Sequence, residues 1–288
     1  MINWTVRPEE DGLMLRQILL NSMRLSWSAL KSAKWNGQIL RNGSPVHMRD
    51  RVHAGERIEV IFPEKDPVYT PAAFSLPLII PYEDDCLMVV DKPAPLASQS
   101  SAGHPTDSLE NAVYFHLGCP AGFIYRPVNR LDKGTSGLMV IARDGHTQDL
   151  LQRQLHSEDF IREYLALTDG IPEAREGVIS LPIRKENAAS VRRIIAPDGQ
   201  AASTRYRVIS AQDRKALIRL RLETGRTHQI RVHLAALGCP VRGDFLYGQE
   251  QPEEFPGRFA LHSAYLRLLH PLTGRLLTFD STPPWLDS

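Results

Sequence analysis

Residues 130–137 form a dense run of charged and small polar side chains between two apolar segments. The run reads Arg-Leu-Asp-Lys-Gly-Thr-Ser-Gly, and the five apolar residues 138–142 that follow it are typical of a buried strand. Asp132 lies between Arg130 and Lys133, and nearby cations favour the ionised form of a carboxylate. An ionised carboxylate at the entrance to a strand can act as a nucleophile or a general base, so Asp132 is a candidate catalytic residue. The alternative is a solvated turn whose charges face water.

A second polar group, residues 225–233, overlaps a predicted helix over 227–237. Thr227 is expected to cap this helix and Gly238 to end it. Its apolar residues recur on one stripe, at Ile230, Leu234 and Leu237. Arg231 lies off that stripe and near the helix N-terminus, an end that attracts anions such as a carboxylate or a phosphate. The alternative for Arg231 is an ordinary surface arginine or an intramolecular ion pair.

The overall composition is ordinary for a folded enzyme and leaves room for two modest domains. The chain has 288 residues, of which 42% are hydrophobic and 23% charged. It contains no run of the roughly eighteen apolar residues that a membrane span needs, and its first eight residues have no apolar core of signal-peptide length. The three cysteines are scattered and suit reduced thiols, and no phosphate-binding glycine loop or metal motif is present. We therefore expect a cytoplasmic protein that uses no cofactor and no metal and does not enter a membrane.

The net charge of +1 conceals two basic segments. Residues 12–58 contain eight Lys or Arg against two Asp or Glu, and residues 175–231 contain thirteen against five. A basic surface is typical of proteins that bind nucleic acids, provided that the charge gathers on one face. The alternative is an even distribution of solvated surface charges.

We interpret residues 1–62 as a small module and residues 63–81 as a proline-rich linker. The five prolines between positions 63 and 81 do not allow a helix or a central strand. Within the module, Ser26 is expected to cap the second of two helices, and Asn42-Gly43 is a strong hairpin signal. The predicted elements of the module are helices over 13–23 and 26–35, a short strand over 39–41 and a closing strand over 57–62.

Residues 82–288 are predicted to form one larger domain of the α+β class. Its strands and helices follow one another without regular βαβ repetition, which favours α+β over α/β. The predicted helix over 107–117 begins at Asp107 or Ser108. The predicted strands cover residues 87–90, 138–142, 159–167 and 216–222.

These motifs resemble those of the RluA-type RNA pseudouridine synthases. The run 130–137 resembles the family's catalytic motif, although Asn129 stands where the family usually has His. Residues 225–233 resemble its second motif, and weaker matches extend the resemblance over about 83–282. The resemblance implies a catalytic domain built on a long mixed, mainly antiparallel sheet flanked by helices. Residues 1–62 resemble, in a degenerate form, the small RNA-binding module of ribosomal protein S-four.

The resemblance also implies roles for individual residues. The implied catalytic residues are Asp132, Tyr164 and Arg231. Those implied for the substrate pocket are Asn129, Arg130, Leu131, Thr135 and Leu261. The residues that we expect to bind RNA are Lys31, Lys34, Arg41, Lys92, Arg226 and His228. The partner would be ribosomal or transfer RNA, the target base would leave its stack to reach the site, and we expect a monomer.

Two other functions remain open from the sequence. A non-catalytic RNA-binding or ribosome-assembly protein could retain the same fold, but such a protein would have no need of Asp132 beside a phosphate-binding surface. A metal-assisted hydrolase could use Asp132 with Asp244, although no cluster of carboxylates or histidines has metal-ligand spacing. For the leading function, the sequence leaves open whether Asp132 adds covalently to the sugar or removes a sugar proton.

Overall fold

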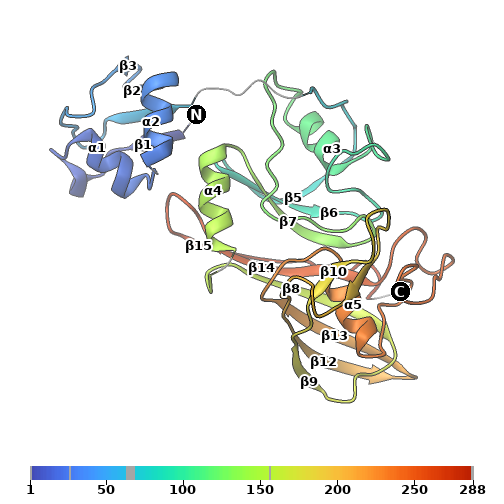
Figure 1. Ribbon diagram of the computed structural model, residues 1–288. Helices are drawn as coiled ribbons and strands as arrows, with labels where there is room; N and C mark the ends of the chain where they lie inside the picture. The colour runs from blue at the N-terminus through green and yellow to red at the C-terminus, as the bar shows by residue number, and fades with distance from the viewer. Residues whose placement is uncertain (1, 26, 63–68, 156, 287–288) are drawn as a thin grey trace.

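The computed structural model describes residues 2–25, 27–62, 69–155 and 157–286. The chain folds into a small N-terminal unit and a larger unit, each with its own sheet (Figure 1). The predicted helix cap Ser26 and the first part of the predicted linker, residues 63–68, lie outside the described residues.

The N-terminal unit, which we call the module, is a four-stranded antiparallel sheet with two short helical segments. The strand order is β1-β4-β2-β3. Its strands are β1 (Ile2–Thr5), β2 (Gln38–Arg41), β3 (Ser44–Pro45) and β4 (Arg57–Ile61). Its helical segments are α1 (Leu15–Gln17), which continues as a π-helical turn over Ile18–Ser22, and α2 (Trp27–Asn36). The predicted hairpin is present, since Asn42 and Gly43 both have the positive φ angles that a tight turn needs. The strand β1 was not predicted.

The larger unit is built on one mixed sheet that is antiparallel except at a single junction, as expected. The strand order is β5-β6-β7-β14-β8-β13-β12-β9, β15 pairs with β14, and only β7 and β14 run parallel. Its strands are β5 (Ile79–Glu83), β6 (Leu87–Lys92), β7 (Ser136–Ala142), β8 (Ile161–Asp169), β9 (Glu176–Ile179), β12 (Thr204–Gln212), β13 (Lys215–Leu222), β14 (Leu261–Leu269) and β15 (Leu276–Asp280). A separate hairpin consists of β10 (Ile183–Lys185) and β11 (Arg193–Ile195).

The central strands are apolar on both faces because helices cover both faces. Along β7, Met139 and Ile141 join the core that contains residues of α3 (Leu109–His116) and α5 (Gln229–Ala236). The alternate residues Leu138 and Val140 join a second core, which includes Leu151 of α4 (Gly145–Gln154). This arrangement accounts for the unbroken apolar run seen in the sequence. The helix α3 begins at the predicted cap, since Ser108 accepts a hydrogen bond from the backbone amide of Asn111.

The end of the proline-rich segment belongs to the large sheet. Residues 79–81, which we expected in the linker, form the first part of β5 and pair with β6. Because β5 is an edge strand with an irregular register between Ile79 and Tyr82, it can include Pro81 without losing a central hydrogen bond. Phe74 and Leu76 also pack against the core.

The module packs on the larger unit near α4. The His146 Nε2 atom lies 3.0 Å from the carbonyl oxygen of Met23, and the His146 ring stacks on that of Phe62. Leu272 of the larger unit is part of the module's core. Within the described residues, no helix is long and apolar enough to cross a membrane.

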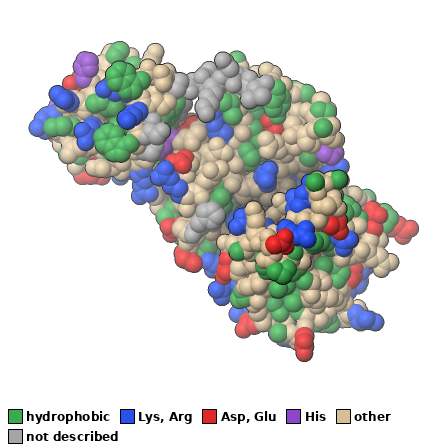
Figure 2. Space-filling model, viewed as in Figure 1, with side chains coloured by type: hydrophobic (Ala, Val, Ile, Leu, Met, Phe, Trp, Pro, Cys, Tyr) green, Lys and Arg blue, Asp and Glu red, His purple; other side chains and the backbone are tan. Residues whose placement is uncertain are grey.

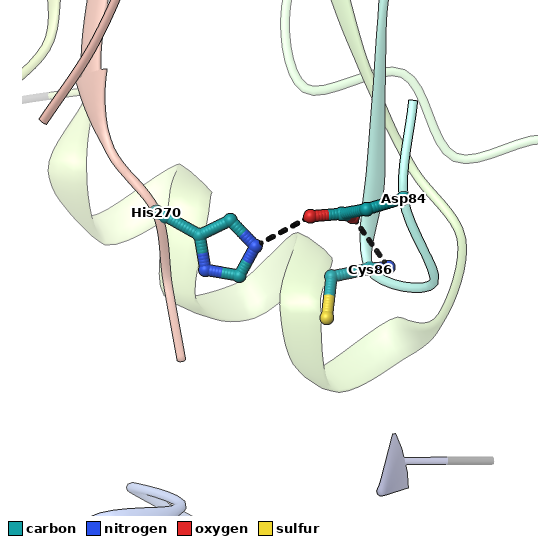
Figure 3. Close-up of side chains that lie close together, drawn as sticks. All are labelled: Asp84, Cys86 and His270. Carbon is teal, nitrogen blue, oxygen red and sulfur yellow. Dashed lines mark hydrogen bonds and ion pairs between the residues drawn. The ribbon is translucent and has the colours of Figure 1, made fainter. Parts of the chain in front are cut away.

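Asp84, Cys86 and His270 gather close to this junction (Figure 3). The carboxylate of Asp84 already accepts four hydrogen bonds, from the Tyr82 hydroxyl, His270 Nε2 and the backbone amides of Cys86 and Leu87. Burial favours the neutral acid, but these hydrogen bonds outweigh it and lower the pKa of Asp84. The geometry of this cluster is therefore that of a satisfied hydrogen-bond network.

Candidate active site

The Asp132 loop enters the sheet at its centre, directly before β7. The Ser98 hydroxyl donates to the Leu131 carbonyl at 2.6 Å and accepts from the Leu131 amide, while the Thr135 amide donates to the carbonyl of Asp132. The backbone on both sides of Asp132 is thus fixed, and its side chain stays 27% exposed. The last glycine of the motif, Gly137, has a φ of 108°, and a Cβ atom there would lie 2.3 Å from a backbone oxygen of β14. The parallel pairing of β7 with β14 therefore requires glycine at this position.

Our prediction that Lys92 binds RNA is wrong. Its side chain is completely buried, and the ammonium donates to the carbonyls of Leu96 at 2.7 Å and Pro93 at 3.0 Å. It also lies 3.5 Å from the carbonyl of Lys133, next to Asp132. Burial lowers the pKa of Lys92 to about 7, although the charges of Asp132 and Asp91 oppose this. Lys92 holds the Asp132 loop from inside the protein.

Arg231 connects Asp132 to a second, fully buried carboxylate. Its Nη1 atom donates to Asp132 Oδ2 at 2.9 Å. Its Nε and Nη2 atoms donate to the two oxygens of Asp244 at 2.6 and 2.8 Å. Burial disfavours the charge on Arg231, but the contacts with both carboxylates outweigh it and raise the pKa of the guanidinium. Arg231 therefore pairs with Asp132, but its bidentate contact is with Asp244.

Three aromatic rings surround this guanidinium. The centroids of Phe245, Tyr247 and Phe259 lie 5.7, 5.0 and 4.3 Å from its central carbon. The Phe259 ring also contacts the Asp132 loop, because a Cβ atom on Gly134 would lie 2.6 Å from it. The ring therefore fixes the loop and the arginine relative to each other. Phe259 was not predicted as a site residue, and Asp244 was considered only as the second carboxylate of a metal-assisted hydrolase.

His228, which we expected to meet RNA at the surface, lies inside the site. Its Nε2 atom is 3.9 Å from Asp132 Oδ2, and its Nδ1 atom is 2.8 Å from the Tyr247 hydroxyl. That hydroxyl also accepts a hydrogen bond from the Arg193 amide. Burial lowers the pKa of His228, although Asp132 opposes the shift.

Tyr164 lies on β8 next to the parallel junction, where it pairs with Ser263 of β14. Its side chain is buried, and burial raises the pKa of the phenol, with a smaller contribution of the same sign from Asp132. The phenol is therefore protonated at neutral pH. Tyr164, Asp132 and Arg231 thus come from a strand, a loop and a helix that meet at the centre of the sheet.

The residues expected to line a substrate pocket differ in accessibility. Arg130 is exposed, whereas four of them are buried: Asn129, Leu131, Thr135 and Leu261. Asn129 accepts a hydrogen bond from the Val140 amide at 2.9 Å, and its buried Nδ2 atom has no partner among the described residues. In this structure these four side chains belong to the interior of the larger unit and not to an open surface.

Three of the residues expected to bind RNA lie in the module and one precedes α5. Lys31 and Lys34 are exposed, and Arg41 is half-buried and donates to the carbonyl of Arg51. Arg226 is exposed and donates to the carbonyl of Ala201.

The predicted cap of α5 was wrong. The N-cap position is His228, whose φ of 58° is left-handed, and it makes no side-chain cap. The Gln229 side chain instead accepts from the Arg226 amide and the Thr224 hydroxyl, which leaves Thr227 exposed. The helix ends as predicted, with Gly238 at positive φ just after it.

A large groove lies away from this site. It has a volume of about 1010 Å³ and runs between α2, the loop of residues 120–126 and α4. None of its lining residues belongs to the Asp132 site. Because the groove contains none of the converging charges described above, the site is identified by its geometry and not by its volume.

The arrangement suits chemistry by a carboxylate that a buried guanidinium holds in place. A guanidinium lies between Asp132 and Asp244 and bonds to both, so these two carboxylates do not form the shared metal site considered from the sequence. Arg231 Nη1 and His228 Nε2 both approach Oδ2 of Asp132. The other oxygen, Oδ1, is the one left for a reacting group.

Comparisons with known proteins match this chain to RNA pseudouridine synthases over most of its length. A model of the family described as RNA pseudouridylate synthase matches residues 86–236. The "Ribosomal large subunit pseudouridine synthase D" of Haemophilus influenzae is 35% identical, over 97% of this chain and 90% of that protein. The "Uncharacterized RNA pseudouridine synthase YlyB" of Bacillus subtilis is 33% identical, over 92% of this chain and 89% of that protein.

A solved structure agrees with these sequence matches. "Human RNA Pseudouridylate Synthase Domain Containing 1" aligns with a TM-score of 0.59 and 26% identity, over 73% of this chain and 85% of that one. The fold, the site geometry and the relatives therefore agree, and the chain belongs to the RNA pseudouridylate synthase family and is an RNA pseudouridine synthase.

Proposed function

We propose that the protein converts specific uridines in RNA to pseudouridine, with Asp132 as the catalytic carboxylate and without a cofactor. The observation that carries this proposal is the contact between Arg231 and Asp132 at 2.9 Å, made by an arginine that Asp244 fixes on its other side. A carboxylate that bonds to a fixed cation is held in one orientation, which a nucleophile or base beside a ribose requires.

The reaction is an isomerisation, so its atoms and electrons balance without a co-reactant. The bond from the ribose to N1 of uracil breaks, the base turns, and a bond from the ribose to C5 forms. C5 loses its proton and N1 gains one, either the same proton or one from solvent. Asp132 either adds to the sugar carbon or removes a neighbouring sugar proton. In either route the free oxygen Oδ1 would be the reacting atom, because Arg231 and His228 both approach Oδ2.

We assign Tyr164 to the base and not to the sugar. Its phenol is protonated at neutral pH because burial raises the pKa. A protonated tyrosine can stack on a flipped uracil and donate a hydrogen bond, and this favours a binding role over proton removal from C5. The Asn129 side chain cannot titrate, so we expect it to influence which uridine is accepted more than the chemical step.

Ribosomal RNA is the first substrate class to test, and transfer RNA is the second. The relatives from Haemophilus influenzae and Nitrosomonas europaea are both named as ribosomal large subunit enzymes, and each is 35% identical to this chain. The exposed Lys31, Lys34 and Arg226 supply positive charge for a phosphate backbone.

The test is to map pseudouridine in total RNA from cells with and without the gene. Cells lacking it are complemented with the wild type, with Asp132→Asn or with Asp213→Asn. Asp213 is a matched control because it is an exposed aspartate in a hairpin, at a positive φ that Asn also adopts. We expect specific sites to disappear on deletion and to return with the wild type and the control, but not with Asp132→Asn. Restoration by Asp132→Asn would favour the non-catalytic RNA-binding alternative.

A further inference from the structure

Two exposed tryptophans lie on one face of α2 in the module. Trp27 is 56% exposed and Trp35 is 72% exposed, whereas Trp4 and Trp285 are buried. A large aromatic side chain in open solvent contributes nothing to the core, so these two are free to contact a partner.

Helical geometry puts two lysines on the same face. At about 100° per residue, Trp27, Lys31, Lys34 and Trp35 fall within an arc of roughly 100°. Both lysines are exposed. The two indole rings are attached about 12 Å apart along the helix, from the rise of about 1.5 Å per residue. We call this exposed face of four residues the Trp–Lys face.

Cations also lie directly against both rings. The guanidinium carbon of Arg16 is 5.0 Å from the Trp27 ring centroid, and the ammonium of Lys34 is 4.7 Å from that of Trp35. Each ring therefore carries a positive charge at one side while much of its surface stays accessible. Hydrophobic and basic side chains alternate on the visible face of the module (Figure 2).

The charge around this face has a single sign. Residues 13–49 contain six Lys or Arg and no Asp or Glu. An interface with another protein is usually poor in lysine at its centre, so the composition fits a polyanion better than a protein surface. In such a polyanion, phosphates would pair with the cations and nucleobases would stack on the indole rings.

We propose that the Trp–Lys face binds unpaired nucleotides of the RNA substrate by stacking bases on Trp27 and Trp35. In a duplex the faces of the bases are covered by their neighbours, so only unpaired nucleotides in loops, bulges or flanking strands can stack on an indole. The spacing of about 12 Å fits two bases that are not adjacent, with phosphates between them at Lys31 and Lys34. This inference rests on the proposed RNA substrate and adds which part of that substrate the module recognises.

The test uses the tryptophan fluorescence of the full-length protein. Because the other two tryptophans are buried, quenching by a large ligand reports on the Trp–Lys face. The probes are a short unstructured RNA strand, the same strand annealed to its complement, and vesicles of anionic phospholipid. We expect saturable quenching by the single strand and little by the duplex or the vesicles.

Variants assign the signal to the two rings. Trp27→Ala and Trp35→Ala should each weaken single-strand binding roughly tenfold, and Trp→Phe at either position should restore most of the affinity. Lys31→Ala should weaken binding to both the single strand and the duplex. Phe115→Ala removes an exposed aromatic from α3 of the larger unit and is the matched control, which should bind as the wild type does.

Three outcomes would overturn the proposal. The first is that the Trp→Ala variants bind the single strand as tightly as the wild type does. The others are that only the vesicles quench the fluorescence, or that the quenching depends on protein concentration because the protein self-associates. Failure here is separable from failure of the proposed catalytic role. Asp132→Asn should keep the quenching and lose turnover, whereas the Trp27→Ala/Trp35→Ala double variant should lose the quenching and raise the RNA concentration needed for half-maximal turnover.

Discussion

Replacing Arg231 by lysine tests whether geometry, and not charge alone, supports Asp132. The guanidinium spans two carboxylates, with two bonds to Asp244 and one to Asp132. A lysine ammonium is a single point and cannot make all three contacts. Because Asp244 is completely buried and an unpaired buried charge is costly, we expect the ammonium to stay with Asp244 and to leave Asp132.

The expected loss of rate follows from the one contact that Arg231→Lys removes, the hydrogen bond to Asp132. A hydrogen bond between charged groups contributes about 1.5–3 kcal/mol. At about 1.4 kcal/mol for each factor of ten, Arg231→Lys should slow the chemical step roughly tenfold to a hundredfold. Thermal stability should fall less than in Arg231→Met, which would leave the buried Asp244 with two backbone amide donors but without its cation.

The assay is the single-turnover rate at saturating RNA, which separates chemistry from binding. Arg226→Lys is the matched control, because Arg226 is exposed and bonds only to a backbone carbonyl among the described residues. We expect Arg226→Lys to change RNA affinity and to leave the rate nearly unaltered. Small and equal losses of rate in both variants would refute the role assigned to Arg231.

Three further predictions follow from the buried and exposed charges. Burial lowers the pKa of four histidines, His146, His228, His233 and His262. The unfolded chain therefore binds protons near pH 6.5 that the folded chain does not, so the free energy of unfolding, measured by urea titration, should fall as the pH is lowered from about 7 to 5. A pH-independent free energy of unfolding in that range would contradict these pKa directions. Lys92→Met leaves the carbonyls of Pro93 and Leu96 without their buried donor, so it should destabilise the protein by about 1–3 kcal/mol and slow turnover. The control variant Lys215→Met should do neither. Wild-type stability and rate in Lys92→Met would mean that the ammonium does not hold the Asp132 loop. Lys31→Ala with Lys34→Ala should reduce the slope of log affinity against log salt by about 1.4 for single-stranded RNA, and an unchanged slope would remove both lysines from the interface.

The sequence was informative where local pattern and chemistry coincide. Asp132 and Arg231 were both identified from short motifs, and the structure brings them within 2.9 Å. The strands β6, β7, β8 and β13 and the helix α3 were also predicted close to their observed bounds, because their apolar residues follow a clear pattern and Ser108 is a strong cap. The long strands β12 and β14 were not predicted.

The errors arose where tertiary contacts override local pattern. Lys92 appeared to lie in a polar turn before a proline, but β6 continues through it into the core, where backbone carbonyls solvate its ammonium. Thr227 was predicted as the helix cap, but the helix begins after His228, and the Gln229 side chain accepts a hydrogen bond from the Arg226 amide. Asp244 was considered only as a metal ligand, because its pairing with Arg231, thirteen positions earlier in the chain, is formed by the fold.

The central claim is that Asp132, held by Arg231, forms pseudouridine. Its most direct test uses RNA carrying tritium at C5 of uridine, prepared from cells that lack the gene. The C5 hydrogen must leave when C5 bonds to the sugar, so purified wild-type protein and Asp213→Asn should release tritium to water. Asp132→Asn should release none while still binding the RNA. Tritium release by Asp132→Asn at the wild-type rate would contradict the account.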